Sequence, residues 1–112
     1  MTLQEKIHSA AEFLRSRIPF APEVGLVLGS GLGDFADTLE DAVRVPYADI
    51  PNFPQPTVEG HTGAFVFGKK QGKNVVALQG RLHYYEGFTQ QELTLPIRVL
   101  AALGAKSLVL TN

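Results

Sequence analysis

Val24-Gly-Leu-Val-Leu-Gly-Ser-Gly-Leu-Gly33 is the stretch of sequence that decides the fold. Its first half is a short, largely apolar run that Pro22 precedes, which predicts a buried β-strand over residues 24–28. Three glycines follow this strand directly, namely Gly29, Gly31 and Gly33. Glycines let backbone N–H groups approach an anion closely, and Ser30 adds a hydroxyl donor. The stretch therefore predicts a buried strand that leads into a phosphate-binding loop.

Two other interpretations of this loop are open. The glycines also suit a strand-to-helix turn that binds no ligand. A dinucleotide-binding fingerprint fits less well, because its third glycine falls on Asp34 and residues 34–42 are too few for the crossover helix of a βαβ unit. The loop alone therefore does not separate an anion site from a plain turn.

Further strands are expected around the first, over residues 43–46, 64–68, 74–78 and 107–110, the last of them also buried. The polar run 69–73 predicts a hairpin turn, so the strands on either side of it should be antiparallel neighbours. Four prolines fall between Pro46 and Pro56, and each removes a backbone donor and fixes φ. That stretch is predicted to be a loop over the surface.

A first helix is predicted near the N-terminus. Thr2 and Glu5 form a capping box, and apolar residues recur at helical spacing from Leu3 to Ile18, until Pro19. A second helix is predicted after another capping box, Thr89 with Glu92, and Gly104 should end it.

Pro96 lies inside the second helical span, so this helix either kinks there or begins near Thr94. Together the elements predict an α/β fold with a mixed, largely buried β-sheet flanked by helices.

Length and composition limit the class of protein. A chain of 112 residues has room for one hydrophobic core. The formal charge of -1 provides no broad basic surface for nucleic acid or an anionic membrane. No cysteine is present, so a disulfide framework and a thiolate metal site are excluded. The N-terminus has neither the basic patch nor the apolar run of a signal peptide, and we expect a cytoplasmic protein.

The most informative segment for function is Gly80-Arg-Leu-His-Tyr-Tyr-Glu-Gly87. Side chains alternate along an extended chain, so Arg81, His83 and Tyr85 should share one face. The Arg81 guanidinium matches the oxygens of a phosphate, and His83 offers a second donor whose tautomer Glu86 can fix. Tyr85 can lay its ring and hydroxyl against a sugar. The alternative is that Arg81 pairs with an acid and its neighbours are ordinary strand residues.

The remaining histidines are less informative. His61, between Gly60 and Gly63, can close over a ligand or simply be solvated. His8 lies off the apolar stripe of the first helix and is not a site residue. Histidines and carboxylates do not show metal-ligand spacing, so no metal site is expected.

Three motifs now stand together: Gly29-Ser-Gly-Leu-Gly33, Gly60-His-Thr-Gly63 and Gly80-Arg-Leu-His-Tyr-Tyr-Glu-Gly87. In order and approximate spacing they resemble the trimeric class of purine nucleoside phosphorylases. Ile50-Pro-Asn-Phe-Pro-Gln55 and Leu110-Thr-Asn112 extend the resemblance, which covers the chain from about residue 20 to its end.

The resemblance implies a role for each matching residue. Inorganic phosphate would be bound by four side chains, those of Ser30, His61, Arg81 and His83. Tyr85 would contact the ribose, and Glu86 would orient His83, so that His83 and Glu86 are the expected catalytic pair. The family uses no cofactor and no metal, and phosphate is a substrate. The expected partners are phosphate, a purine nucleoside and further copies of the chain, as a trimer.

The resemblance also implies what residues 1–112 lack. In the family the chain continues into a second phosphate-binding region and the residues that hold the purine. We therefore expect residues 1–112 to be a single incomplete phosphorylase domain, truncated after the strand that ends near Asn112 and inactive alone. A relative that cleaves methylthioadenosine is one alternative. Another is a non-catalytic half-fold that binds phosphate weakly and associates through its exposed terminal strand.

Overall fold

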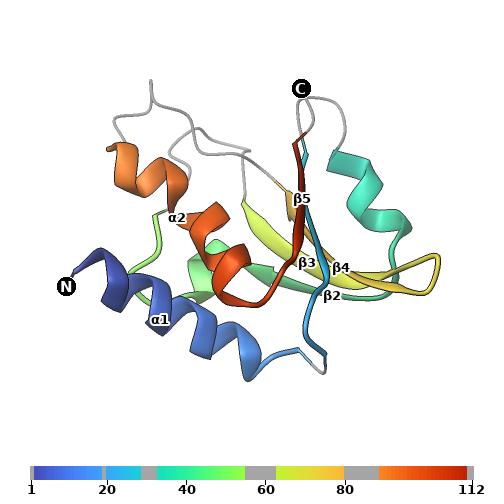
Figure 1. Cartoon of the computed structure of the whole chain (residues 1–112), viewed down its shortest axis with the longest axis horizontal. Helices are drawn as coiled ribbons and strands as arrows, with labels where there is room; N and C mark the ends of the chain where they lie inside the picture. Colours follow the sequence, from blue (N-terminus) through green and yellow to red (C-terminus); the bar gives the residue numbers. More distant parts are fainter. Residues whose placement is uncertain (1, 19, 29–32, 55–62, 80–88, 111–112) are drawn as a thin grey trace.

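The computed structural model describes residues 2–18, 20–28, 33–54, 63–79 and 89–110 (Figure 1). The chain runs through α1 (Leu3–Arg15), β1 (Val24–Val27), η1 (Gly33–Thr38), β2 (Glu40–Pro46) and η2 (Tyr47–Asp49), where η marks a 3₁₀ helix. It continues through β3 (Ala64–Lys70), β4 (Lys73–Gln79), α2 (Gln90–Ala102) and β5 (Ser107–Leu110).

The five strands form one mixed sheet in the order β2-β3-β4-β1-β5. Strands β2, β3 and β4 are antiparallel neighbours, whereas β4, β1 and β5 run parallel. The predicted hairpin between β3 and β4 is present. Its turn is tight, with Gln71 and Gly72 both at positive φ, 51° and 79°. Two consecutive left-handed residues match the right-handed twist of the strands that they join. The predicted α/β class with a mixed sheet is confirmed.

Both predicted capping boxes are present. At α1 the Thr2 hydroxyl accepts from the backbone N–H of Glu5 at 3.1 Å, and the Glu5 carboxylate accepts from the N–H of Thr2. That second hydrogen bond lowers the pKa of Glu5 below its usual value. The periodicity overestimated the length of this helix, because it ends at Arg15, four residues before Pro19. Ser16 caps it, with its backbone N–H bonded to the carbonyl of Glu12.

Helix α2 settles the question that Pro96 raised. It begins at Gln90, directly after the cap Thr89, and continues through Pro96 to Ala102. The helix therefore does not begin near Thr94. Gly104 lies just beyond its end with a φ of 106°, as predicted for a helix-terminating glycine.

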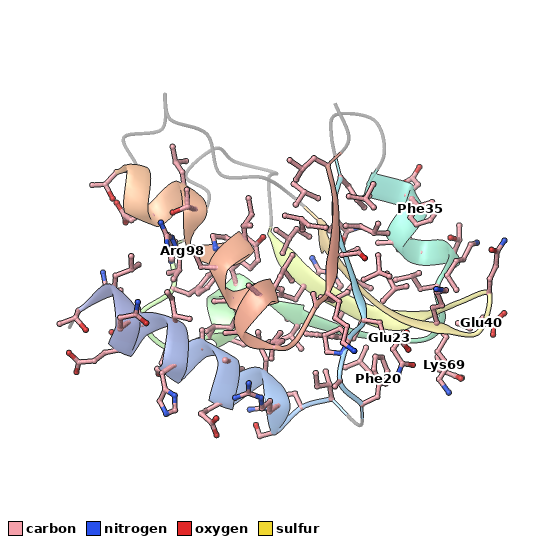
Figure 2. The ribbon with its side chains drawn as sticks, in the orientation of Figure 1. Phe20, Glu23, Phe35, Glu40, Lys69 and Arg98 are labelled. Carbon is pink, nitrogen blue, oxygen red and sulfur yellow. The ribbon has the colours of Figure 1, made fainter. Side chains whose placement is uncertain are left out.

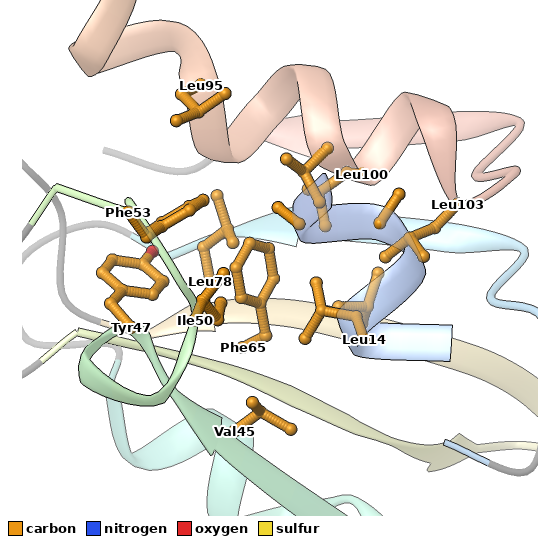
Figure 3. Close-up of a cluster of buried hydrophobic side chains, with 14 of the residues drawn as sticks. Leu14, Val45, Tyr47, Ile50, Phe53, Phe65, Leu78, Leu95, Leu100 and Leu103 are labelled. Atoms are coloured by element: carbon orange, nitrogen blue, oxygen red, sulfur yellow. The ribbon is translucent and has the colours of Figure 1, made fainter. Parts of the chain in front are cut away.

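The core lies on both faces of the sheet. Helices α1 and α2 cover one face, which buries the larger cluster; it includes Leu14, Phe65, Phe67, Leu95 and Leu100 (Figure 3). On the other face Ala36 of η1 and Leu39, directly after η1, pack on Val66, Val75 and Ala77. Among the described residues, no helix is both long and apolar enough to span a bilayer.

Two predictions about burial are wrong. The proline-rich stretch from Pro46 is not simply a surface loop, because Tyr47, Ile50 and Phe53 in it are buried in the main cluster. The terminal strand β5 is present but is not buried, since all of its residues are exposed and Leu110 is 65% accessible. Among the described strands, β5 has a neighbour on one side only, and that is β1.

Candidate functional site

The candidate site is defined by the carboxyl edge of the three parallel strands. Val27 at the end of β1 pairs with Leu78 of β4 on one side and with Leu110 of β5 on the other. The backbone N–H of Leu28 still bonds to the carbonyl of Leu78 at 3.4 Å. Ligands of open α/β sheets bind outside this edge.

Most of the predicted site residues lie outside the described part of the chain. These are Gly29, Ser30, Gly31, His61, Arg81, His83, Tyr85 and Glu86. Gly33 is the exception, as the first residue of η1. The structure therefore tests the framework from which these residues extend rather than their own contacts.

The framework brings together the residues that flank the predicted site segments. Leu28 precedes the glycine loop, and Gln79, which precedes Gly80, pairs with Ala64. Gly63, directly before Ala64, follows the segment that holds His61. The ends of β1 and β4 and the start of β3 thus lie at one edge of the sheet.

Charged side chains of the described residues lie at several places around the sheet (Figure 2). Glu23, which precedes β1, lies at the opposite edge of the sheet, and Glu40 and Lys69 lie near the β3–β4 turn (Figure 2). At the carboxyl edge, Arg44 Nε donates to Gln79 Oε1 at 3.4 Å, a long hydrogen bond that links β2 to the end of β4.

Tyr47 and Gly63 form a close contact beneath this edge. The backbone N–H of Tyr47 donates to the Gly63 carbonyl at 2.9 Å. The Tyr47 ring covers the Cα of Gly63 so closely that a Cβ built there would overlap the ring atoms Cδ2 and Cε2. This contact leaves no room for a side chain at position 63, which explains the glycine there.

Two phenylalanines also pack against the Tyr47 ring. Its centroid lies 4.9 Å from that of Phe53 and 5.3 Å from that of Phe65, in tilted and edge-on arrangements (Figure 3). Such geometries are favourable for aromatic pairs. Burial raises the pKa of the Tyr47 hydroxyl far above its usual value, because the ionised form would lose its contact with water.

The sequence analysis missed Tyr47 because prolines surround it. The sequence does contain one signal, since Tyr47, Ile50 and Phe53 recur every three residues. In the structure the N–H groups of Ile50 and Phe53 donate to the carbonyls of Tyr47 and Ile50. A period of three matches the 3₁₀ turn that is observed.

Comparisons with known proteins agree with this framework. The family model of the phosphorylase superfamily matches residues 23–112. Purine nucleoside phosphorylase 1 of Geobacillus stearothermophilus is 53% identical over 106 residues, which are 95% of this chain and 39% of that protein. The chain thus spans about two fifths of the length of the curated relatives it matches.

The solved structures that this chain resembles are also purine nucleoside phosphorylases. The purine nucleoside phosphorylase of Schistosoma mansoni in complex with acetate has a TM-score of 0.92 and 42% identity, covering 100% of this chain and 42% of that one. Isoform 2 from the same organism, in complex with cytosine and ribose-1-phosphate, has a TM-score of 0.90 and 44% identity, with 96% and 38% covered.

Proposed function

Because the chain belongs to the phosphorylase superfamily, we propose that it forms the phosphate- and ribose-binding portion of a purine nucleoside phosphorylase. The reaction is the attack of phosphate on a purine nucleoside, which gives the free base and ribose 1-phosphate. The observation that supports this most strongly is that the described residues flanking the three proposed site segments lie at one edge of the sheet. The similar protein from Schistosoma mansoni was solved with ribose-1-phosphate.

Chain connectivity supports a shared anion site. Ser30 lies two residues after Leu28, Arg81 two after Gln79, and His61 two before Gly63. Two extended residues span at most about 7 Å, and adjacent strands lie about 4.8 Å apart. A guanidinium, a hydroxyl and an imidazole that start from these anchors can therefore meet at one phosphate.

The proposed chemistry depends on positioning and charge. A phosphate oxygen forms a bond to the anomeric carbon while the glycosidic C–N bond breaks, and the electron pair of that bond leaves with the purine, which takes up a proton. Arg81 and the backbone N–H groups of residues 29–33 hold the anionic nucleophile beneath a carbon that becomes cationic. His83, oriented by Glu86, adds a donor to phosphate, and Tyr85 positions the ribose. Neither a cofactor nor a metal takes part in this proposal.

Residues 1–112 contain no evident donor for the leaving purine, so we propose that the chain alone is inactive. The test is to join it to the part of the Geobacillus stearothermophilus protein outside the matched stretch, and to measure phosphorolysis of inosine. We expect turnover from the joined protein and none from the 112-residue chain. Methylthioadenosine, assayed alongside, tests the alternative substrate. If the joined protein turns over neither inosine nor methylthioadenosine at saturating phosphate, the proposal is contradicted.

The exposed β5 strand supports a second proposal, in which the isolated chain associates with a second copy. Leu108 and Val109 are 45% and 46% accessible, and the strand holds neither a charge nor a proline to protect its edge. In an antiparallel pair related by a two-fold axis, Val109 can face its equivalent while Leu108 faces Leu110. In this register the same face of the sheet continues from one copy into the other. Apolar side chains then lie opposite each other on both faces.

Replacing Val109 with lysine is expected to abolish this association, because the register places two like charges opposite each other. Sedimentation at chain concentrations of about 100 µM, where a small interface is still populated, measures the effect. Lys106→Ala, just outside the strand, is the control and should associate like the unmodified chain. If the unmodified chain sediments as a strict monomer, this second proposal is contradicted.

A further inference from the structure

Tyr47 contacts both flanks of the segment that holds His61. The chain passes from the described part at Pro54 and returns at Gly63. Phe53, next to Pro54, packs with its ring 4.9 Å from that of Tyr47. Gly63 lies under the same ring and accepts the hydrogen bond of the Tyr47 backbone. One side chain therefore fixes where the segment leaves the fold and where it returns.

The surroundings of Tyr47 give it little freedom to move. Its side chain is 1% accessible, and Phe65 closes it off from the sheet side at 5.3 Å. Pro46, the residue directly before Tyr47, pairs with Ala64, so strand pairing also holds the backbone at this point. A rigid support of this kind transmits its position to the residues that it touches.

Gly63 lies close to a second segment of the proposed site. Its neighbour Ala64 pairs with Gln79, from which the chain leads to Arg81. The position of Gly63 under the Tyr47 ring therefore sets the spacing between the start of the Arg81 segment and the end of the His61 segment. Anion binding by groups from two segments depends on that spacing.

We propose that Tyr47 is a positioning residue for the anion site: its ring, packed between Phe53 and Gly63, fixes the two ends of the His61 segment and thereby sets the affinity for phosphate. This rests on the proposed function. Tyr47 itself lies beneath the site, in the core, and does not contact phosphate in this proposal.

The test compares Tyr47→Leu with Phe67→Leu. Both side chains are buried in the same cluster, but Phe67 packs on Phe65 at 6.3 Å and pairs with Val43 and Val76, away from Gly63. We expect both variants to lose similar thermal stability. Only Tyr47→Leu should weaken binding of inorganic phosphate, by about tenfold, since small misplacements in a site have effects of this size or larger.

Two further measurements complete the test. Tyr47→Phe keeps the ring, so it should retain phosphate affinity within about threefold even where the lost hydroxyl lowers stability. Amide hydrogen exchange over residues 55–62 should accelerate in Tyr47→Leu and not in Phe67→Leu. Equal losses of affinity in Tyr47→Leu and Phe67→Leu, or unchanged affinity in Tyr47→Leu, overturn the proposal.

The exchange measurement separates this proposal from the proposed function. If the unmodified chain, joined to the Geobacillus stearothermophilus remainder, binds no phosphate, the proposed phosphate site fails, and faster exchange in Tyr47→Leu alone still supports the anchoring by Tyr47. Equal exchange in the two leucine variants overturns the anchoring whether or not phosphate binds.

Discussion

Replacing Gly63 with alanine is expected to destabilise the fold by about 3 kcal/mol or more, the upper range for overpacking a rigid core. The added methyl group would overlap the Tyr47 ring. That ring cannot retreat, because Phe53 and Phe65 pack against it. In a domain of this size each kcal/mol lowers Tm by about 4–8 °C, so thermal unfolding should show a loss of more than about 12 °C.

A control and a double variant make this expectation specific. Gly72 has open space around it, and Gly72→Ala costs only the strain of its positive φ, about 1 kcal/mol. Tyr47→Ala removes the ring, so Gly63→Ala should cost little in that background. A double-mutant cycle with strong coupling confirms the contact, whereas additive effects, or a loss no larger than that of Gly72→Ala, contradict it.

Local chemistry made much of the fold predictable. The capping boxes at Thr2 and Thr89 and the turn at Gly72 depend on residues within a few positions of one another. Their partners are visible in the sequence, and the structure confirms them. The end of α1 was less predictable, since apolar spacing continues to Ile18 although the helix stops at Arg15.

Burial was predicted less well because it depends on neighbours far away in the chain. Tyr47 is buried by Phe65 and by Gly63, and prolines in the same stretch indicated a surface loop instead. In the opposite direction, the apolar β5 sequence is typical of a buried strand, but only β1 lies beside it among the described strands. Composition does not specify which elements are available to cover a strand.

The proposed site remains a prediction from a set of motifs, and the topology brings together the described residues that flank those motifs. The glycine loop and the Arg81 segment are about fifty residues apart in the sequence, yet β1 and β4 are adjacent and parallel. No local pattern reveals that pairing. The support beneath the site, Tyr47 on Gly63, could not be predicted because it joins two segments across a sheet edge.

Replacing Arg81 with alanine is expected to weaken phosphate binding by about 100-fold or more, because two charge-assisted hydrogen bonds are together worth about 3 kcal/mol or more. The binding of inorganic phosphate to the chain joined to the Geobacillus stearothermophilus remainder measures the effect directly. Arg98→Ala is the matched control, since it removes the same charge from an exposed position on α2, where Nε bonds to the Thr94 hydroxyl. That control should bind phosphate like the unmodified chain.

The same substitution distinguishes a phosphate ligand from a residue that supports the whole site. In the protein joined to the Geobacillus stearothermophilus remainder, loss of the fixed countercharge should raise the KM for phosphate far more than the KM for inosine. A residue that only maintained the shape of the site would change both constants together, whereas a general loss of folding would lower the turnover and leave both KM values unchanged. Equal increases in the two KM values therefore contradict the role assigned to Arg81, and with it the proposal that the glycine loop and the Arg81 segment hold one anion between them.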